Sequence, residues 1–176
     1  MIDQSAADAY DQVFYPSAAE PSIHPDRLAT VATLFGVRPA PVDQCRVLEL
    51  GCADGANLLP MAYALPHGTF FGIDASPRQI AAGQAQIAAL GLKNVRLQAL
   101  DLQELPASSG EFDYIIAHGV YSWVAPAVQE ALLALCGRHL AANGVAVVSY
   151  NVLPGWHQRG VARDLLRFHT RQFAEP

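Results

Sequence analysis

The stretch VLELGCADGANLLPM, residues 47–61, carries an acidic residue, Glu49, just before two glycines, Gly51 and Gly55. The apolar residues before the first glycine predict a buried strand, and those after the second predict a helix. A glycine-bearing loop between a strand and a helix is typical of sites that hold a nucleotide or a nucleoside-containing cofactor. Glutamate is seldom buried without a partner. Glu49 therefore faces either a cationic ligand group, such as an amino-acid ammonium, or a charge of the chain itself, such as Arg46.

The loop departs from the fingerprint of dinucleotide-binding proteins, which needs the pattern G-x-G-x-x-G. Starting at Gly51 the sequence reads GCADGAN, with Ala53 and Ala56 at the second and third glycine positions. These alanines, and Glu49 before the loop, argue against an NAD-dependent oxidoreductase. That class is kept as the less favoured alternative.

The elements around the loop alternate between strands and helices. Apolar runs predict strands at 45–50, 68–74, 94–101, 112–119 and 145–151, and helical spacing predicts helices at 56–65, 76–91, 125–140 and from about 156 onward. Asn143-Gly144 is predicted to turn the third of these helices into the last strand. This order predicts an α/β fold: a Rossmann-like, doubly wound parallel sheet in three layers. In such sheets ligands bind at the carboxyl ends of the strands.

The segments at those carboxyl ends resemble the motifs of the class I S-adenosylmethionine-dependent methyltransferases. VLELGCADG resembles their motif I, and GIDAS at 72–76 is similar to the motif whose acid holds the ribose hydroxyls. ALDLQELP resembles the adenine-binding motif, and FDYIIAHGVYSWV the fourth-strand motif that faces the methyl group. The resemblance covers about residues 45–151. It implies S-adenosylmethionine as cofactor, S-adenosylhomocysteine as product, and these cofactor-binding residues: Glu49, Gly51, Cys52, Ala53, Gly55, Asn57, Asp74, Ala75, Asp101, Leu102 and His118.

The resemblance also implies a role for each part of this set. Backbone N–H groups from Gly51 to Gly55 would bind the cofactor's carboxylate, and Glu49 would bind or order water around its ammonium group. Asp74 would accept from both ribose hydroxyls, and Asp101 from the adenine amino group. The alternative for Asp74 and Asp101 is that they only cap the turns or helices that follow them.

Acceptor residues are expected after the fourth and fifth strands. His118 and Tyr121 are the candidate catalytic residues, because a neutral histidine can take a proton from the acceptor. The substrate candidates are Tyr121, Trp123, Tyr150, Asn151 and Trp156. The alternatives are a histidine satisfied by backbone hydrogen bonds in a turn, and aromatic rings that only pack neighbouring elements. No cluster with metal-ligand spacing is predicted.

The flanking segments carry a narrower resemblance. HPDRLATVATLFG before the first strand and SYNVLPGWH after the last resemble bacterial methyltransferases whose catalytic domain precedes a C-terminal regulatory domain. Some relatives of that group are protein lysine methyltransferases. The acceptor stays open between a small molecule and a protein side chain, and a non-catalytic module that binds S-adenosylmethionine is the alternative function.

Two regions are expected, an N-terminal helical segment and linker at 1–44 and a cofactor-binding domain at 45–176. Tyr10, Phe14, Tyr15 and His24 are candidates for a lid over the cofactor. Class I methyltransferases have two more strands after the fifth, so we expect a domain truncated at its C-terminus. Its exposed fifth strand would be covered by a second copy, by a following domain or by the last helix.

Composition excludes several classes of partner. The formal net charge of −5 argues against a nucleic-acid partner, and no run of 18 apolar residues predicts a membrane span. Cys45, Cys52 and Cys136 lack C-x-x-C spacing, which favours a reducing cytoplasm over disulfides or zinc. Arginines recur every four residues on the last helix, at Arg159, Arg163, Arg167 and Arg171. This pattern is typical of a solvated helix face, with contact to an acidic partner or a following domain as the alternative.

Overall fold

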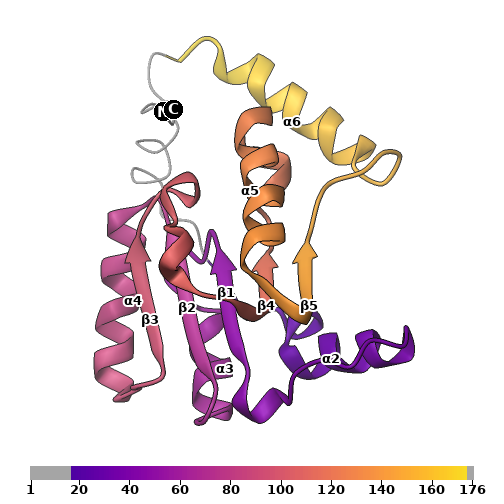
Figure 1. Ribbon diagram of the computed structural model, residues 1–176. Helices are drawn as coiled ribbons and strands as arrows, with labels where there is room; N and C mark the ends of the chain where they lie inside the picture. The colour runs from indigo at the N-terminus through magenta and orange to yellow at the C-terminus, as the bar shows by residue number, and fades with distance from the viewer. Residues whose placement is uncertain (1–16, 174–176) are drawn as a thin grey trace.

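A computed structural model describes residues 17–173 of the chain; the lid candidates Tyr10, Phe14 and Tyr15 lie outside these residues. The fold is a single sheet of five parallel strands in the order β3-β2-β1-β4-β5 (Figure 1). The strands are β1 (Arg46–Leu50), β2 (Thr69–Asp74), β3 (Val95–Ala99), β4 (Phe112–Ala117) and β5 (Leu140–Val148). The predicted doubly wound parallel sheet is confirmed.

Helices cover both faces of this sheet, which makes three layers. The covering helices are α2 (Pro25–Leu34), α3 (Leu58–Ala64), α4 (Pro77–Leu90) and α5 (Pro126–His139), and α6 (His157–Thr170) follows β5. Among these helices α4 has the clearest start and end signals. The Ser76 hydroxyl accepts from the Gln79 amide at its start, and Gly91, at φ 66°, ends it. Within residues 17–173 no helix is long and apolar enough to cross a membrane.

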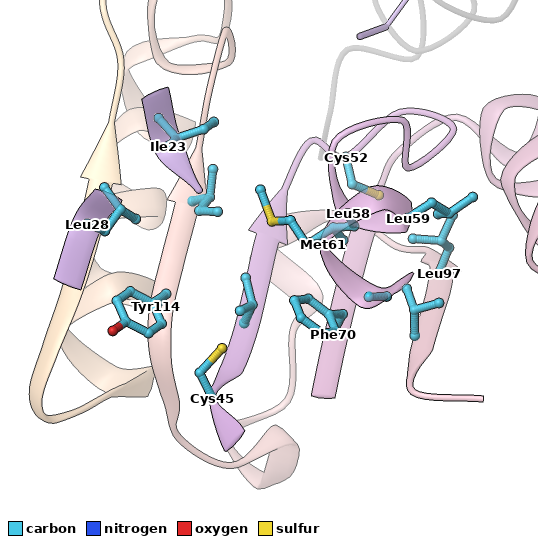
Figure 2. Close-up of a cluster of buried hydrophobic side chains, with 14 of the residues drawn as sticks. Ile23, Leu28, Cys45, Cys52, Leu58, Leu59, Met61, Phe70, Leu97 and Tyr114 are labelled. Carbon is cyan, nitrogen blue, oxygen red and sulfur yellow. The ribbon is translucent and has the colours of Figure 1, made fainter. Parts of the chain in front are cut away.

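Two apolar clusters, one on each face, hold the layers together. On the first face α2, α3 and α4 pack against alternate residues of the strands, such as Val47. Figure 2 shows Phe70 and Leu97 in this cluster. On the other face α5 packs its Leu132 and Leu135 against the intervening strand residues, such as Leu48. Alternation along β1 therefore serves both cores, as a sheet buried on two sides requires. The three cysteines are buried and unpaired.

The last strand begins earlier than predicted. β5 starts at Leu140, directly after α5, and Asn143 and Gly144 lie inside it and do not form the turn into it. Asn143 has φ 64°, and the pairing with β4 shifts register between Phe112 and Tyr114. Asn143-Gly144 therefore forms an irregularity within β5 and not a turn, because pairing with the fully buried strand β4 outweighs its local turn propensity.

Among residues 17–173, β5 pairs with β4 alone, so its other edge is the outer edge of the sheet. The last helix, α6, lies beyond the carboxyl ends of the strands near one end of α5, not along this edge (Figure 1). None of the side chains of α6 is buried. The expectation that the last helix folds across the fifth strand is therefore wrong for this structure.

Candidate functional site

The site lies where the strand order reverses. β1 is the central strand, with β2 on one side and β4 on the other. The connections on its two sides run over opposite faces of the sheet, so the loop after β1 lies at the opening between them. The carboxyl ends of β1, β2 and β4 carry Glu49, Asp74 and His118. These residues, distant in sequence, meet at one edge of the sheet as predicted.

The glycine loop is tightly folded onto its neighbours. Gly51 has φ 72°, and a Cβ atom there would lie 2.4 Å from a methyl group of Val120, so only glycine fits. The amides of Gly51 and Cys52 both donate to the Ile73 carbonyl oxygen, at 2.8 and 3.0 Å, and the Gly55 amide donates to the Cys52 oxygen. In this structure these amides serve the loop's own fold, and their binding of a cofactor carboxylate stays a prediction.

Glu49 is fully enclosed at the end of β1 and has an asymmetric environment. Its Oε1 accepts from the side-chain amide of Asn57 at 2.8 Å, while Oε2 has no hydrogen-bond partner within the described residues. Burial raises the pKa of Glu49 to about 8, with a smaller contribution from the charge of Asp74, against the lowering effect of the Asn57 hydrogen bond. The alternative partner Arg46 is instead bound to Asp113, at 3.0 Å. An unpartnered buried carboxyl oxygen is what a ligand cation would satisfy.

Asp74 joins β2 to the glycine loop. One carboxylate oxygen accepts from the Ala53 amide and the other from the Ser76 amide, each at 2.9 Å. Ala53 has φ 49°, a left-handed conformation at the position of the missing glycine. Asp74 is half-buried. Its predicted capping role is therefore confirmed, and its contact with the ribose hydroxyls stays a prediction.

Asp101 follows β3 and begins a short 3-10 helix. Its carboxylate accepts from the Gln103 amide at 2.9 Å, and both Asp101 and Leu102 are half-buried. The predicted capping is present here as well, and the adenine contact stays a prediction. Ala75, the other candidate beside the ribose, is exposed between Asp74 and α4.

The segment that precedes α2 is tied to the glycine loop. The Ser17 hydroxyl donates to Asp54, and the Glu20 amide donates to Asn57 Oδ1 at 2.9 Å. Asn57 thus bridges the N-terminal segment to Glu49. His24 caps α2, since its Nδ1 accepts from the Asp26 amide at the start of that helix, and its role in a lid stays a prediction.

The acceptor candidates gather in a pocket of about 350 Å³ beyond β4 and β5. Two ring pairs form part of its wall: Tyr121 with Tyr150 at 6.2 Å between centroids, and Trp123 with Trp156 at 5.9 Å, both edge-to-face. Asn151 also lines the pocket, and its amide donates to the Ser122 hydroxyl at 2.7 Å. All five predicted substrate residues are therefore brought together.

His118 is exposed at the end of β4 and makes no side-chain hydrogen bond within residues 17–173. The turn is instead closed by the Gly119 amide, which donates to the Ser149 hydroxyl at 2.8 Å. The alternative of a histidine satisfied by its own turn is thus not what the structure shows.

Three further residues line the pocket without having been predicted as substrate residues: Ser122, Gln129 and Arg163. Gln129, on α5, holds the turn by donating to the Tyr121 carbonyl oxygen at 2.8 Å. Nothing in the local sequence marks Gln129, whereas Arg163 belongs to the arginine repeat. The position of Arg163 beside the pocket follows only from where α6 lies.

The comparison with known proteins agrees with this geometry. Residues 47–144 match a family model described as "Methyltransferase domain". The solved structure of PKMT2 from Rickettsia typhi in complex with AdoHcy is similar to this chain with a TM-score of 0.85 and 40% identity, over 92% of this chain and 31% of that one. The chain belongs to the class I S-adenosylmethionine-dependent methyltransferases. The predicted family, fold and cofactor are confirmed.

Two proteins of Rickettsia prowazekii, both uncharacterized, are further relatives of this methyltransferase. One is 40% identical over 173 residues, which cover 98% of this chain and 69% of the relative. The other is 42% identical over 164 residues, which cover 93% of this chain and 30% of the relative. The methyltransferase thus spans less than a third of two of these three proteins. The C-terminal regulatory domain of the narrower resemblance stays a prediction.

Proposed function

We propose that this chain transfers the methyl group of S-adenosylmethionine to an amino group of a protein side chain, with lysine as the acceptor. The cofactor part of this proposal rests on Glu49 Oε2, a buried carboxyl oxygen beside the glycine loop that has no hydrogen-bond partner among the described residues. An ammonium group of the cofactor would satisfy it, so the residues present fit the group. When bound, the cofactor supplies a methyl group already activated as a sulfonium.

In this proposal the chain's residues bind, orient and move a proton. Asp74 would hold the ribose and Asp101 the adenine, and Glu49 would pair with the ammonium after losing its proton. The bound cofactor would supply its methyl group to the lone pair of the neutral acceptor nitrogen and would keep the carbon–sulfur electron pair as it becomes S-adenosylhomocysteine. The acceptor's proton goes to a ring nitrogen of His118, whose exposed imidazole makes no other bond among the described residues.

The amine acceptor rests on the aromatic rings of the pocket. Faces of tyrosine and tryptophan attract ammonium and methylammonium groups by about 0.5–2 kcal/mol. Tyr121, Trp123, Tyr150 and Trp156 would therefore hold a lysine before and after methylation. The narrower sequence resemblance, which includes protein lysine methyltransferases, supports the same acceptor class.

The test is calorimetric titration of the chain with S-adenosylmethionine, S-adenosylhomocysteine and, as a control, NAD. Asp74→Ala removes the ribose acceptor, and Glu130→Gln, an exposed carboxylate on α5, is the matched control. Loss of hydrogen bonds to a charged group should weaken binding by about 1.5–3 kcal/mol in Asp74→Ala alone. Thermal unfolding of each variant checks that the loop tied by Asp74 still folds.

Turnover is measured separately, with lysine-containing peptides as acceptors and His118→Ala as the proton-transfer variant. We expect methylation by the wild-type chain and at least a hundredfold slower turnover in His118→Ala, the usual effect of removing a general base. Cofactor binding without turnover on any peptide would instead support the non-catalytic alternative. Binding of NAD in preference to S-adenosylmethionine would contradict the proposal outright.

A further inference from the structure

The first two arginines of the α6 repeat lie at or beside the pocket, which the sequence alone did not show. Arg163 lines the pocket together with the aromatic residues. The Arg159 guanidinium lies 5.1 Å from the ring centroid of Trp156, another pocket residue at the start of the same helix. Since residues three or four apart share a helix face, Trp156, Arg159 and Arg163 lie on one side. Arg167 and Arg171 continue that side away from the pocket.

The charge on this face is largely uncompensated. All four arginines are exposed, and within residues 17–173 only Arg163 has an acidic partner, its neighbour Asp164 at 3.3 Å. An exposed pair between adjacent residues contributes little. Of the residues that the structure describes, no carboxylate lines the pocket. On a chain of net charge −5, the stripe is therefore a local positive region that begins at the acceptor pocket.

We infer that the arginine face of α6 is a docking surface for an acidic stretch of the polypeptide that carries the acceptor side chain. The inference rests on the proposed function, since the aromatic pocket is taken as the acceptor's place. Methyl transfer would then select lysines that have aspartate or glutamate next to them in the sequence.

The length of the stripe favours a polypeptide over a small anion. Arg171 lies twelve positions after Arg159, which is about 18 Å along a helix at 1.5 Å per residue. An extended peptide covers that distance with about five residues. A small carboxylate would occupy one arginine and leave the others without a role, whereas a run of acidic residues pairs with several of them at once.

The same face also excludes a second cationic group beside the acceptor. A lysine within a basic sequence would bring like charges next to Arg159 and Arg163, which costs free energy at close range. The stripe therefore discriminates among lysines by their neighbours, while the aromatic rings recognise the amine itself.

The experiment uses two synthetic peptides with one central lysine, flanked on one side by aspartates in the first and by asparagines in the second. Fluorescence anisotropy measures their binding to the whole chain, with and without S-adenosylhomocysteine, so the peptide result does not depend on cofactor binding. The test variant is Arg163→Gln/Arg167→Gln. Arg138→Gln, at an exposed position in the last turn of α5, removes an arginine away from α6 and is the matched control.

We expect the acidic peptide to bind about three- to tenfold more tightly than the asparagine peptide, as two or three exposed ion pairs predict. The ratio of the two peptide affinities should fall to nearly one in the double variant and in ~1 M salt, where the screening length is about 3 Å. Arg138→Gln should keep it. Equal binding of the two peptides by the wild-type chain, or a preference that the double variant retains, overturns the inference.

Vesicles that contain phosphatidylserine serve as the competing ligand. Binding to them that is lost in the double variant, together with no peptide preference, assigns the stripe to a membrane surface and overturns the inference. Titration with S-adenosylhomocysteine runs in parallel. Failure there alone contradicts the proposed function, and failure of the peptide preference alone contradicts only the docking surface.

Discussion

Glu49 couples the cofactor site to the stability of the fold. Burial raises its pKa from 4.5 to about 8, so between these values the folded chain holds a proton that the unfolded chain releases. The free energy of unfolding therefore falls as pH rises through this range, by at most about 1.4 kcal/mol per pH unit for one group. Glu49→Gln removes the titrating group, and we expect it to flatten this pH dependence.

Urea unfolding at several pH values between 5 and 8 measures the effect for the chain without cofactor. Glu130→Gln, an exposed carboxylate on α5, serves as the control and should keep the wild-type slope. A Glu49→Gln chain whose stability still falls with pH as steeply as the wild type would show that Glu49 is ionised in the fold. In that case its unpartnered oxygen would need another explanation.

At the scale of elements, the approach of α4 to the glycine loop depends on one residue, Gly83. A Cβ atom there would lie 2.3 Å from the carbonyl oxygen of Asp54 in the loop and 2.4 Å from a methyl group of Leu97. Gly83→Ala gains up to about 1 kcal/mol of helix propensity but must push backbone apart. Overpacking of this kind costs typically about 1–3 kcal/mol, so we expect net destabilisation and weaker binding of S-adenosylhomocysteine.

Gly137→Ala is the matched control for this prediction. Gly137 lies in α5, and a Cβ atom there meets nothing within 4 Å. Urea unfolding should show Gly137→Ala equal to or more stable than the wild type. A Gly83→Ala chain that is equally stabilised would mean that the loop moves freely from α4.

Element types were predictable where local signals and packing agree. For α4 the cap Ser76, the early Pro77 and the terminal Gly91 gave its bounds almost to the residue. For β5 the signals conflict, because Asn143-Gly144 favours a turn while pairing with buried β4 extends the strand to Leu140. The start of that strand is decided by a neighbour distant in sequence, which periodicity does not report.

The whole molecule assembles a site that the sequence names only in part. Parallel strands bring their carboxyl ends to one edge, so Glu49, Asp74 and His118 could be grouped from sequence. The pairing of Trp123 with Trp156, and the turn of Arg163 toward them, depends on the path of the chain from β5 into α6. That path follows from loop conformation, for which the sequence carries no periodic signal.

The molecule should open unevenly, because burial is unevenly distributed over its helices. α5 buries Leu132, Leu135, Cys136 and His139, whereas α6 buries no side chain. Local opening costs least where few apolar contacts must break, so we expect amides of α6 to exchange with deuterium much faster than those of α5.

S-adenosylhomocysteine stabilises the folded site by mass action and should slow exchange in residues 51–57. It should leave α6 unchanged, since no cofactor candidate lies there. Hydrogen–deuterium exchange with mass spectrometry measures both effects on the 176-residue chain. Equal protection of α5 and α6 without ligand would contradict the expectation that α6 opens first. Slower exchange of α6 when only S-adenosylhomocysteine is added would mean that cofactor binding is coupled to the acceptor pocket.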